Sequence, residues 1–173
     1  MSEAAHALAA EFARESAITR RVLERVPTDR LEWQPHTKSM TLGQLAQHIA
    51  LIPASMVRLS QLNGLDMATR RFEHAQGEST PAILATFDAS VATAKAALTG
   101  LEQGAAKETW RMTAGDREIF SMPRIDMMRL MGMHHQIHHR GELVVYLRLL
   151  DVPVPIVYGR SADEQPFAQQ AAV

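Results

Sequence analysis

The sequence predicts an all-α protein, a four-helix bundle with a short hairpin or a long loop before the last helix. Apolar residues recur every three or four positions in four stretches, prolines and glycines separate these stretches, and no stretch alternates as a strand would. The 173 residues, 46% of them hydrophobic, can bury a core without disulfide staples. We therefore expect a single domain over residues 1–173, with a polar tail from about residue 161.

The first two helices follow from apolar spacing and from the residues that end it. Residues 2–26 are good helix formers with apolar side chains at helical spacing, and Pro27 ends the helix. The second helix is expected over 41–61. Pro53 lies inside it and predicts a kink or a loosened turn, because proline removes the hydrogen bond to the residue four positions back. Its apolar stripe consists of Leu42, Leu45, Ile49, Ile52, Met56 and Leu59.

The second half of the chain alternates between polar connections and helices. Residues 64–79 are expected to form a polar loop, and the third helix covers 80–101, opened by a Thr-Pro pair. Residues 102–122 have no helical stripe, and the turn signal at 114–116 allows a long loop or a short hairpin. The fourth helix is expected over 123–150, where an aspartate and two prolines follow.

Composition excludes several classes of function. With 18 Lys+Arg against 19 Asp+Glu, the net charge of -1 gives no attraction to nucleic acid or to an anionic membrane. The chain has no cysteine, so any thiol chemistry needs a thiol from a cosubstrate, which suits a reducing compartment. We find no signal peptide and no apolar stretch long enough to span a bilayer. A cytoplasmic protein with a small-molecule substrate is expected.

The run of four histidines at 134–139 offers metal ligands. Residues four apart share one helix face, so His134 can chelate with His138, and His135 with His139. Neutral imidazoles bind zinc and also suit nickel, iron and copper. A site of three histidines that leaves positions open to water is the catalytic pattern.

A helical wheel favours the pair His135 and His139. At about 100° per residue, that direction includes two polar residues, whereas the His134 direction has no second polar partner. His138 lies about 60° from His135, so it stays an alternative ligand or a hydrogen-bonding neighbour. The favoured face also carries Met128, Met131, Glu142, Tyr146 and Leu149.

A third ligand can come from the second helix. His48 flanks the stripe of that helix and leans toward the bundle interior, although a lone histidine there can equally be a hydrogen-bonded core residue. His6, His36 and His74 are interpreted as surface or loop residues. Gln136 follows His135 where a zincin needs glutamate, so a metalloprotease is excluded.

Three stretches resemble the DinB-like family of metalloenzymes, described together with the YfiT-like proteins. They are WQPHTKSMTLGQLAQHIA at 33–50, HHQIHHRGELVVYLRLL at 134–150 and DVPVPIVYGRSADE at 151–164. The resemblance implies a four-helix bundle that binds nickel, zinc or a similar ion through His48, His135 and His139. Glu142 stands where the family often has glutamine. Relatives include transferases and isomerases that use low-molecular-weight thiols, and homodimers are common among them.

Two hypotheses of function follow. The first is a metal-dependent enzyme, a thiol-dependent S-transferase in stress or detoxification chemistry or else a hydrolase. In it one divalent ion, nickel or zinc with iron or manganese as alternatives, activates a thiol or water, and Glu142 or Tyr146 handles a proton. The second is a non-catalytic module that the metal stabilises and that recruits a protein partner.

Overall fold

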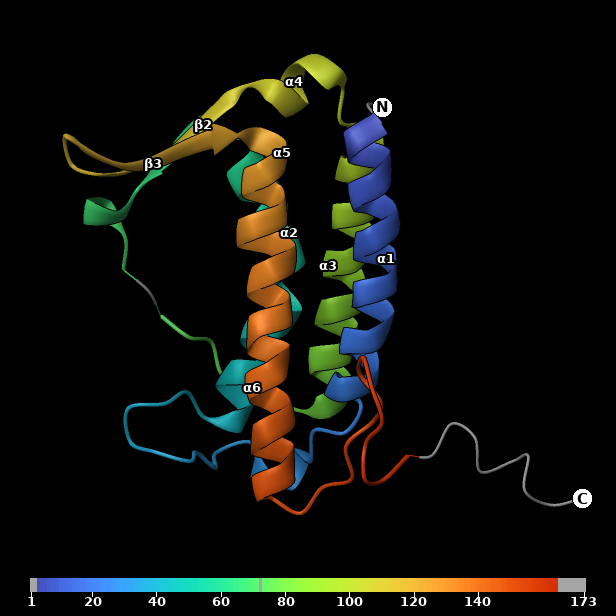
Figure 1. Ribbon diagram of the computed structural model, residues 1–173. Helices are drawn as coiled ribbons and strands as arrows, with labels where there is room; N and C mark the ends of the chain where they lie inside the picture. The colour runs from blue at the N-terminus through green and yellow to red at the C-terminus, as the bar shows by residue number, and fades with distance from the viewer. Residues whose placement is uncertain (1–2, 72, 165–173) are drawn as a thin grey trace, which may run out of the picture.

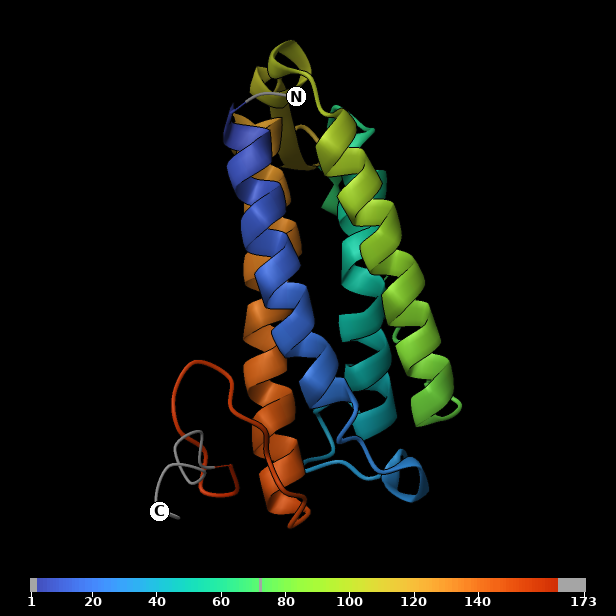
Figure 2. The ribbon, with the colours of Figure 1, turned by 90° about the vertical axis from the view of Figure 1, so that its right-hand side faces the viewer.

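Four long helical segments pack side by side, and a small sheet lies across one end of them (Figures 1 and 2). This computed structural model describes residues 3–71 and 73–164. The long helices are α1 Glu3–Leu23, α2 Leu42–Ser60, α3 Thr80–Gly100 and a last one built from α5 Arg124–Met127, the π-helical η3 Met128–His134 and α6 His135–Leu149. The shorter elements are η1 Thr28–Arg30, β1 Gly64–Asp66, η2 Met67–Thr69, α4 Gln103–Lys107, β2 Thr109–Ala114 and β3 Arg117–Pro123.

The predicted helices are confirmed with small changes at their ends. α1 begins at Glu3 and ends at Leu23; the predicted start at residue 2 lies outside the described residues. α2 begins with a capping box, in which Gln44 N donates to Thr41 Oγ1 at 3.1 Å and Thr41 N donates to Gln44 Oε1 at 3.0 Å. The N-cap of α3 is Ser79, whereas the Thr-Pro pair predicted Thr80, and Ala82 N donates to Ser79 Oγ at 3.3 Å.

α2 continues through Pro53, which has a consequence for its neighbour. Proline has no N–H, so the carbonyl of Ile49 loses its partner within the helix. Gln136, a buried residue of α6, donates its Nε2 to this carbonyl at 3.4 Å. The carbonyl that Pro53 leaves without a partner in α2 is therefore bonded by α6 instead. This hydrogen bond lies close in sequence to both His48 and His135.

The prediction of an all-α protein is wrong in one respect, because three strands form a sheet in the order β1-β2-β3. The hairpin expected within 102–122 is confirmed as the antiparallel pair β2 and β3, whose turn includes Gly115 at φ 60°. β1 falls in the expected polar loop and pairs in parallel with β2, Gly64 opposite Arg111. Three residues are too few to show an alternating pattern, so the sequence did not predict β1.

The π-helical segment of the last helix was not expected either. Gly132 lies in it against α2, and a Cβ at this position would come within 2.3 Å of Met56 Sδ and 3.0 Å of Met56 Cβ. Glycine thus allows the two helices to approach closely here. A π turn also changes the helical phase, so a wheel at 100° per residue does not extend from α6 back across η3.

The buried core runs along the inner faces of the four helices, and α2 packs against both α3 and the last helix. Over residues 3–71 and 73–164, none of the helices has the length and apolar character needed to cross a bilayer. The largest fully buried apolar side chains include Trp110, Phe12, Phe87, Leu8, Leu23, Leu42, Leu45 and Ile49.

The segment after α6 folds back along the bundle toward α1. Asp163 pairs with Arg148 of α6. Glu164 pairs with Arg21 of α1 at 2.6 Å and with Arg25, just after α1, at 3.0 Å. The beginning of the predicted polar tail is therefore held by ion pairs. Residues 165–173 of that tail lie outside the described residues.

Candidate metal centre

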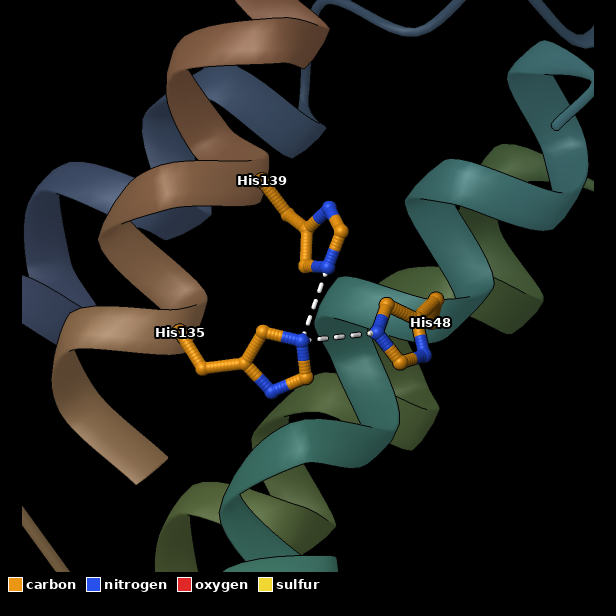
Figure 3. A group of neighbouring side chains, drawn as sticks. All are labelled: His48, His135 and His139. Atoms are coloured by element: carbon orange, nitrogen blue, oxygen red, sulfur yellow. Dashed lines mark hydrogen bonds between the residues drawn. The ribbon is translucent and has the colours of Figure 1, made fainter. Parts of the chain in front are cut away.

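Three histidines from two helices point toward one another (Figure 3). His48 comes from α2, and His135 and His139 come from successive turns of α6. The Nε2 atom of His135 lies 3.5 Å from that of His48 and 2.8 Å from that of His139. One ring nitrogen from each of the three lies within 4.8 Å of the others.

The donor atoms and their protonation suit a divalent metal ion. Burial, and then the neighbouring imidazoles, lower the pKa of His48 to about 4, and burial also lowers the pKa of His135. Both rings are therefore neutral at pH 7 and can offer lone pairs. A tetrahedral ion at 2.0–2.1 Å from its ligands holds their nitrogens about 3.3 Å apart, close to the spacing of His48 and His135.

A second layer of hydrogen bonds orients the rings. His139 Nδ1 lies 2.6 Å from Glu142 Oε2, and with Nδ1 donating to the carboxylate, Nε2 is the atom that would bind a metal. In the metal-free protein this Nε2 shares a hydrogen bond with His135 Nε2. His135 forms a hydrogen bond with the backbone of Met131. The other carboxylate oxygen of Glu142 lies 3.3 Å from His138 Nε2. Glu142 therefore holds one candidate ligand and faces an exposed histidine.

The remaining predicted residues lie around this group. His134 and His138 are exposed, so the structure brings His135 and His139 to His48 and leaves the other pair outward. Among residues 3–71 and 73–164, His138 belongs to one further possible ligand group, with His139 and Glu142. Tyr146 packs its ring edge-on against Trp33, with centroids 5.6 Å apart, and donates its hydroxyl to the carbonyl of Met40 at 3.3 Å.

His74 is exposed, as predicted, but sequence reasoning missed its place beside the site. Its ring meets that of His48 edge-on, with centroids 5.6 Å apart. Gln76 anchors the loop, donating Nε2 to the carbonyl of Leu31 at 3.2 Å and accepting from the hydroxyl of Thr41 at 2.8 Å. No helical spacing connects a loop histidine to α2, so the sequence carries no signal for this contact.

A cavity of about 770 Å³ opens beside the histidines, and His48 and His135 form part of its wall. α2 supplies one side, and β1, η2 and the chain that follows supply the other. This volume falls in the range of small-molecule sites. A ligand in the cavity can therefore reach two of the three imidazoles.

Arg140, the residue after His139, ties the site to α1. Its side chain is 1% exposed, and the guanidinium donates to Glu15 Oε2 at 2.8 Å and to Thr19 Oγ1 at 3.1 Å. It also donates to the Tyr158 hydroxyl and stacks over that ring at 4.9 Å. This buried cluster fixes the backbone of α6 directly beside a candidate ligand.

The stability of the metal-free protein is expected to fall as pH drops from 6.5 to about 4. In that interval unfolded His48, with its ordinary pKa of 6.5, takes up a proton that the folded residue does not bind. Because the ring is only half-buried, we expect a loss of about 1 kcal/mol after allowing for solvent screening. Urea unfolding at pH 7 and pH 4.5 measures it, and His48→Gln should reduce the difference. An equal difference in both proteins would contradict the assignment to His48.

Comparison with known proteins identifies the family. A DinB-like protein from Bacillus subtilis matches with a TM-score of 0.65 and 18% identity, over 88% of this chain and 98% of that one. A DinB-like protein from Bacillus cereus ATCC 10987 matches with a TM-score of 0.62 and 20% identity, over 86% and 93%. At these identities the likeness shows the fold alone, and no curated protein matches the chain. The sequence model of the DinB family matches residues 1–170, so the chain belongs to the DinB family.

Proposed function

We propose that the protein is a metal-dependent transferase that moves the thiol of a low-molecular-weight cosubstrate onto an electrophile, in stress or detoxification chemistry. The observation that carries this proposal is the convergence of three imidazoles, at least two of them held neutral by burial, beside a cavity of about 770 Å³. The absence of cysteine from the chain agrees with a thiol supplied from outside.

In this proposal His48, His135 and His139 hold one divalent ion, nickel or zinc first, with iron or manganese as alternatives. When bound there, the ion would supply Lewis acidity, which generates a thiolate or hydroxide nucleophile at neutral pH. Glu142 orients His139 and accepts the released proton at its other carboxylate oxygen, 3.3 Å from exposed His138. Tyr146 is the second candidate for proton transfer, and it must first leave the carbonyl of Met40.

A screen for turnover tests the proposal. Protein loaded with nickel or zinc is mixed with monochlorobimane and with glutathione, bacillithiol or mycothiol in turn, and the fluorescent thioether is followed. We expect turnover that needs both the metal and one thiol and that His135→Ala abolishes. Hydrolysis of ester substrates without any thiol would favour a hydrolase instead. Unchanged background rates with metal bound would support the non-catalytic module, in which the ion joins α2 to α6 and a protein partner is recruited.

Replacing Glu142 by glutamine is expected to lower kcat about 100-fold, because the amide cannot accept the proton. Metal affinity should fall about tenfold, since His139 loses its charged partner. Stopped-flow assays and competition with a metal indicator measure the two effects separately. Glu102→Gln, an exposed glutamate at the start of α4, serves as the control and should change neither. If Glu142→Gln keeps the wild-type kcat, Glu142 does not accept the proton and Tyr146 becomes the candidate.

We further propose that the protein works in the cytoplasm as a homodimer. Val145 and Leu149, both on α6, are 56% and 58% exposed, so this helix presents apolar surface outside the core. Multi-angle light scattering gives the mass directly. A mass near 19.2 kDa at micromolar concentration would reject the dimer.

A further inference from the structure

The cavity beside the histidines carries three arginines on its walls, and the proposed chemistry uses none of them. We propose that this cavity binds an amphipathic carboxylate, with its anionic group on Arg58, Arg70 and Arg71 and its apolar part along the wall that leads to His48 and His135. This inference rests on the proposed function in one respect only, namely that a ligand held in this way extends to His48 and His135, two of the imidazoles that would hold the metal.

The arginines form a cationic surface with free hydrogen-bonding capacity. Arg58 donates Nη2 to Ser55 Oγ at 2.8 Å, which positions the guanidinium and leaves most of its N–H groups free. Within residues 3–71 and 73–164, no carboxylate lies within 4.0 Å of a side-chain nitrogen of any of the three. Glu73 is the one acidic residue among the described lining residues. Guanidinium groups bind carboxylates in two parallel hydrogen bonds, so an anionic ligand fits.

The rest of the lining is largely apolar. Its hydrophobic members come from α2, β1, η2 and η3, and they include Leu51, Ile52, Leu59, Leu65, Met67 and Met131. A small hydrated anion gains nothing from such a wall. A ligand with an alkyl chain binds more tightly for each methylene group that the wall removes from water. Arg58 follows His48 by ten residues on α2, about 15 Å along the helix axis. A ligand that spans this interval has a chain of several carbons between its carboxylate and the metal site.

The walls are held in place without a ligand. Asp66 Oδ1 accepts from Ala68 N and from Gly115 N, each at 2.9 Å, and so joins η2 to the hairpin turn. Trp110 donates its indole N–H to the carbonyl of Leu59 at 3.0 Å, which fixes the end of α2. The small sheet therefore holds β1 and η2, which contribute Leu65 and Met67 to the outer wall of the cavity. A ligand entering a preformed site loses less free energy to ordering the protein.

Calorimetric titration of the zinc-loaded protein tests this inference. Octanoate is compared with hexanoate, octanol and octylammonium, and the double variant Arg58→Gln/Arg71→Gln is compared with Arg14→Gln/Arg117→Gln, two exposed arginines that do not line the cavity. We expect octanoate to bind at least tenfold more tightly than octanol or hexanoate, because the carboxylate and each buried methylene both contribute. The cavity double variant should lose about tenfold or more, and the control variant should lose nothing.

A third variant, His135→Ala, tests where the carboxylate group binds. In His135→Ala, octanoate should bind within about threefold of its wild-type affinity, since its anionic group lies on the arginines. If His135→Ala abolishes binding while the arginine variant keeps it, the carboxylate sits on the metal and the inference is wrong. Equal affinities for octanoate and octylammonium would also overturn it. The titrations of the arginine variants and of His135→Ala measure binding and do not depend on thiol transfer. Failure of the proposed function is therefore distinguishable from failure of this inference.

Discussion

Chelation is expected to lower the melting temperature of the metal-loaded protein by roughly 5–10 °C. A ligand present at 100 times its Kd stabilises the folded state by about 2.7 kcal/mol, and each kcal/mol shifts Tm by about 2–4 °C in a domain of this size. His48 lies on α2 and the other two candidate ligands lie on α6, so an ion bound to all three would join helices that separate on unfolding. Differential scanning calorimetry with and without EDTA measures the shift.

The double variant His135→Ala/His139→Ala should bind no metal and should show no shift with EDTA. The neighbouring pair offers a matched control, because His134→Ala/His138→Ala removes two imidazoles from the same helix but from its exposed side. This control should keep one ion per chain and most of the shift. If elemental mass spectrometry finds the full metal content in His135→Ala/His139→Ala, these histidines do not form the metal site.

Replacing Arg140 by leucine is expected to destabilise the protein by about 3–5 kcal/mol. The substitution leaves the carboxylate of Glu15 mostly buried without its cation, and breaking one partner of such a pair costs about this much. Urea unfolding followed by circular dichroism measures the change. Tyr158→Phe removes only one hydroxyl from the same cluster, so it should cost about 1 kcal/mol.

The Arg140 prediction also has an outcome that would reject it. Arg140→Lys keeps the charge but loses most of the donors, so its stability should fall between that of the wild type and that of the leucine variant. If Arg140→Leu and Arg140→Lys both unfold at the wild-type urea concentration, the buried cluster does not stabilise α6. In that case both Arg140 variants should also bind as much metal as the wild type at low temperature.

The helices could be predicted because each carries its own local signals. The apolar stripe at 42–59, the Thr-Pro pair after Ser79 and the stop at Pro27 act within a few residues of the chain. β1 and the π-helical segment depend instead on partners far away in sequence, Arg111 for Gly64 and Met56 for Gly132. No local pattern contains such information.

The candidate site divides in the same way. His135, His139 and Glu142 lie within regular α6, where spacing alone places them on one face and close together. His48 could be assigned to the same site only through the family resemblance, because no spacing connects two different helices. The contact with His74 and the arginines of the cavity follow from how the loop and the sheet fold back. A single sequence does not show that arrangement.

The cluster around Arg140 also bears on the order in which the protein folds. Tyr158 donates to Glu15, and Arg21 donates to Glu164, each across 143 residues of chain. Closing so long a loop is entropically costly, and contacts of this range slow folding. α1 therefore cannot complete these contacts until the segment that contains Tyr158 and Glu164 has folded back onto it. Tyr158 follows all three candidate ligands in the chain, so the support for α6 beside His139 is completed by a segment outside the four helices.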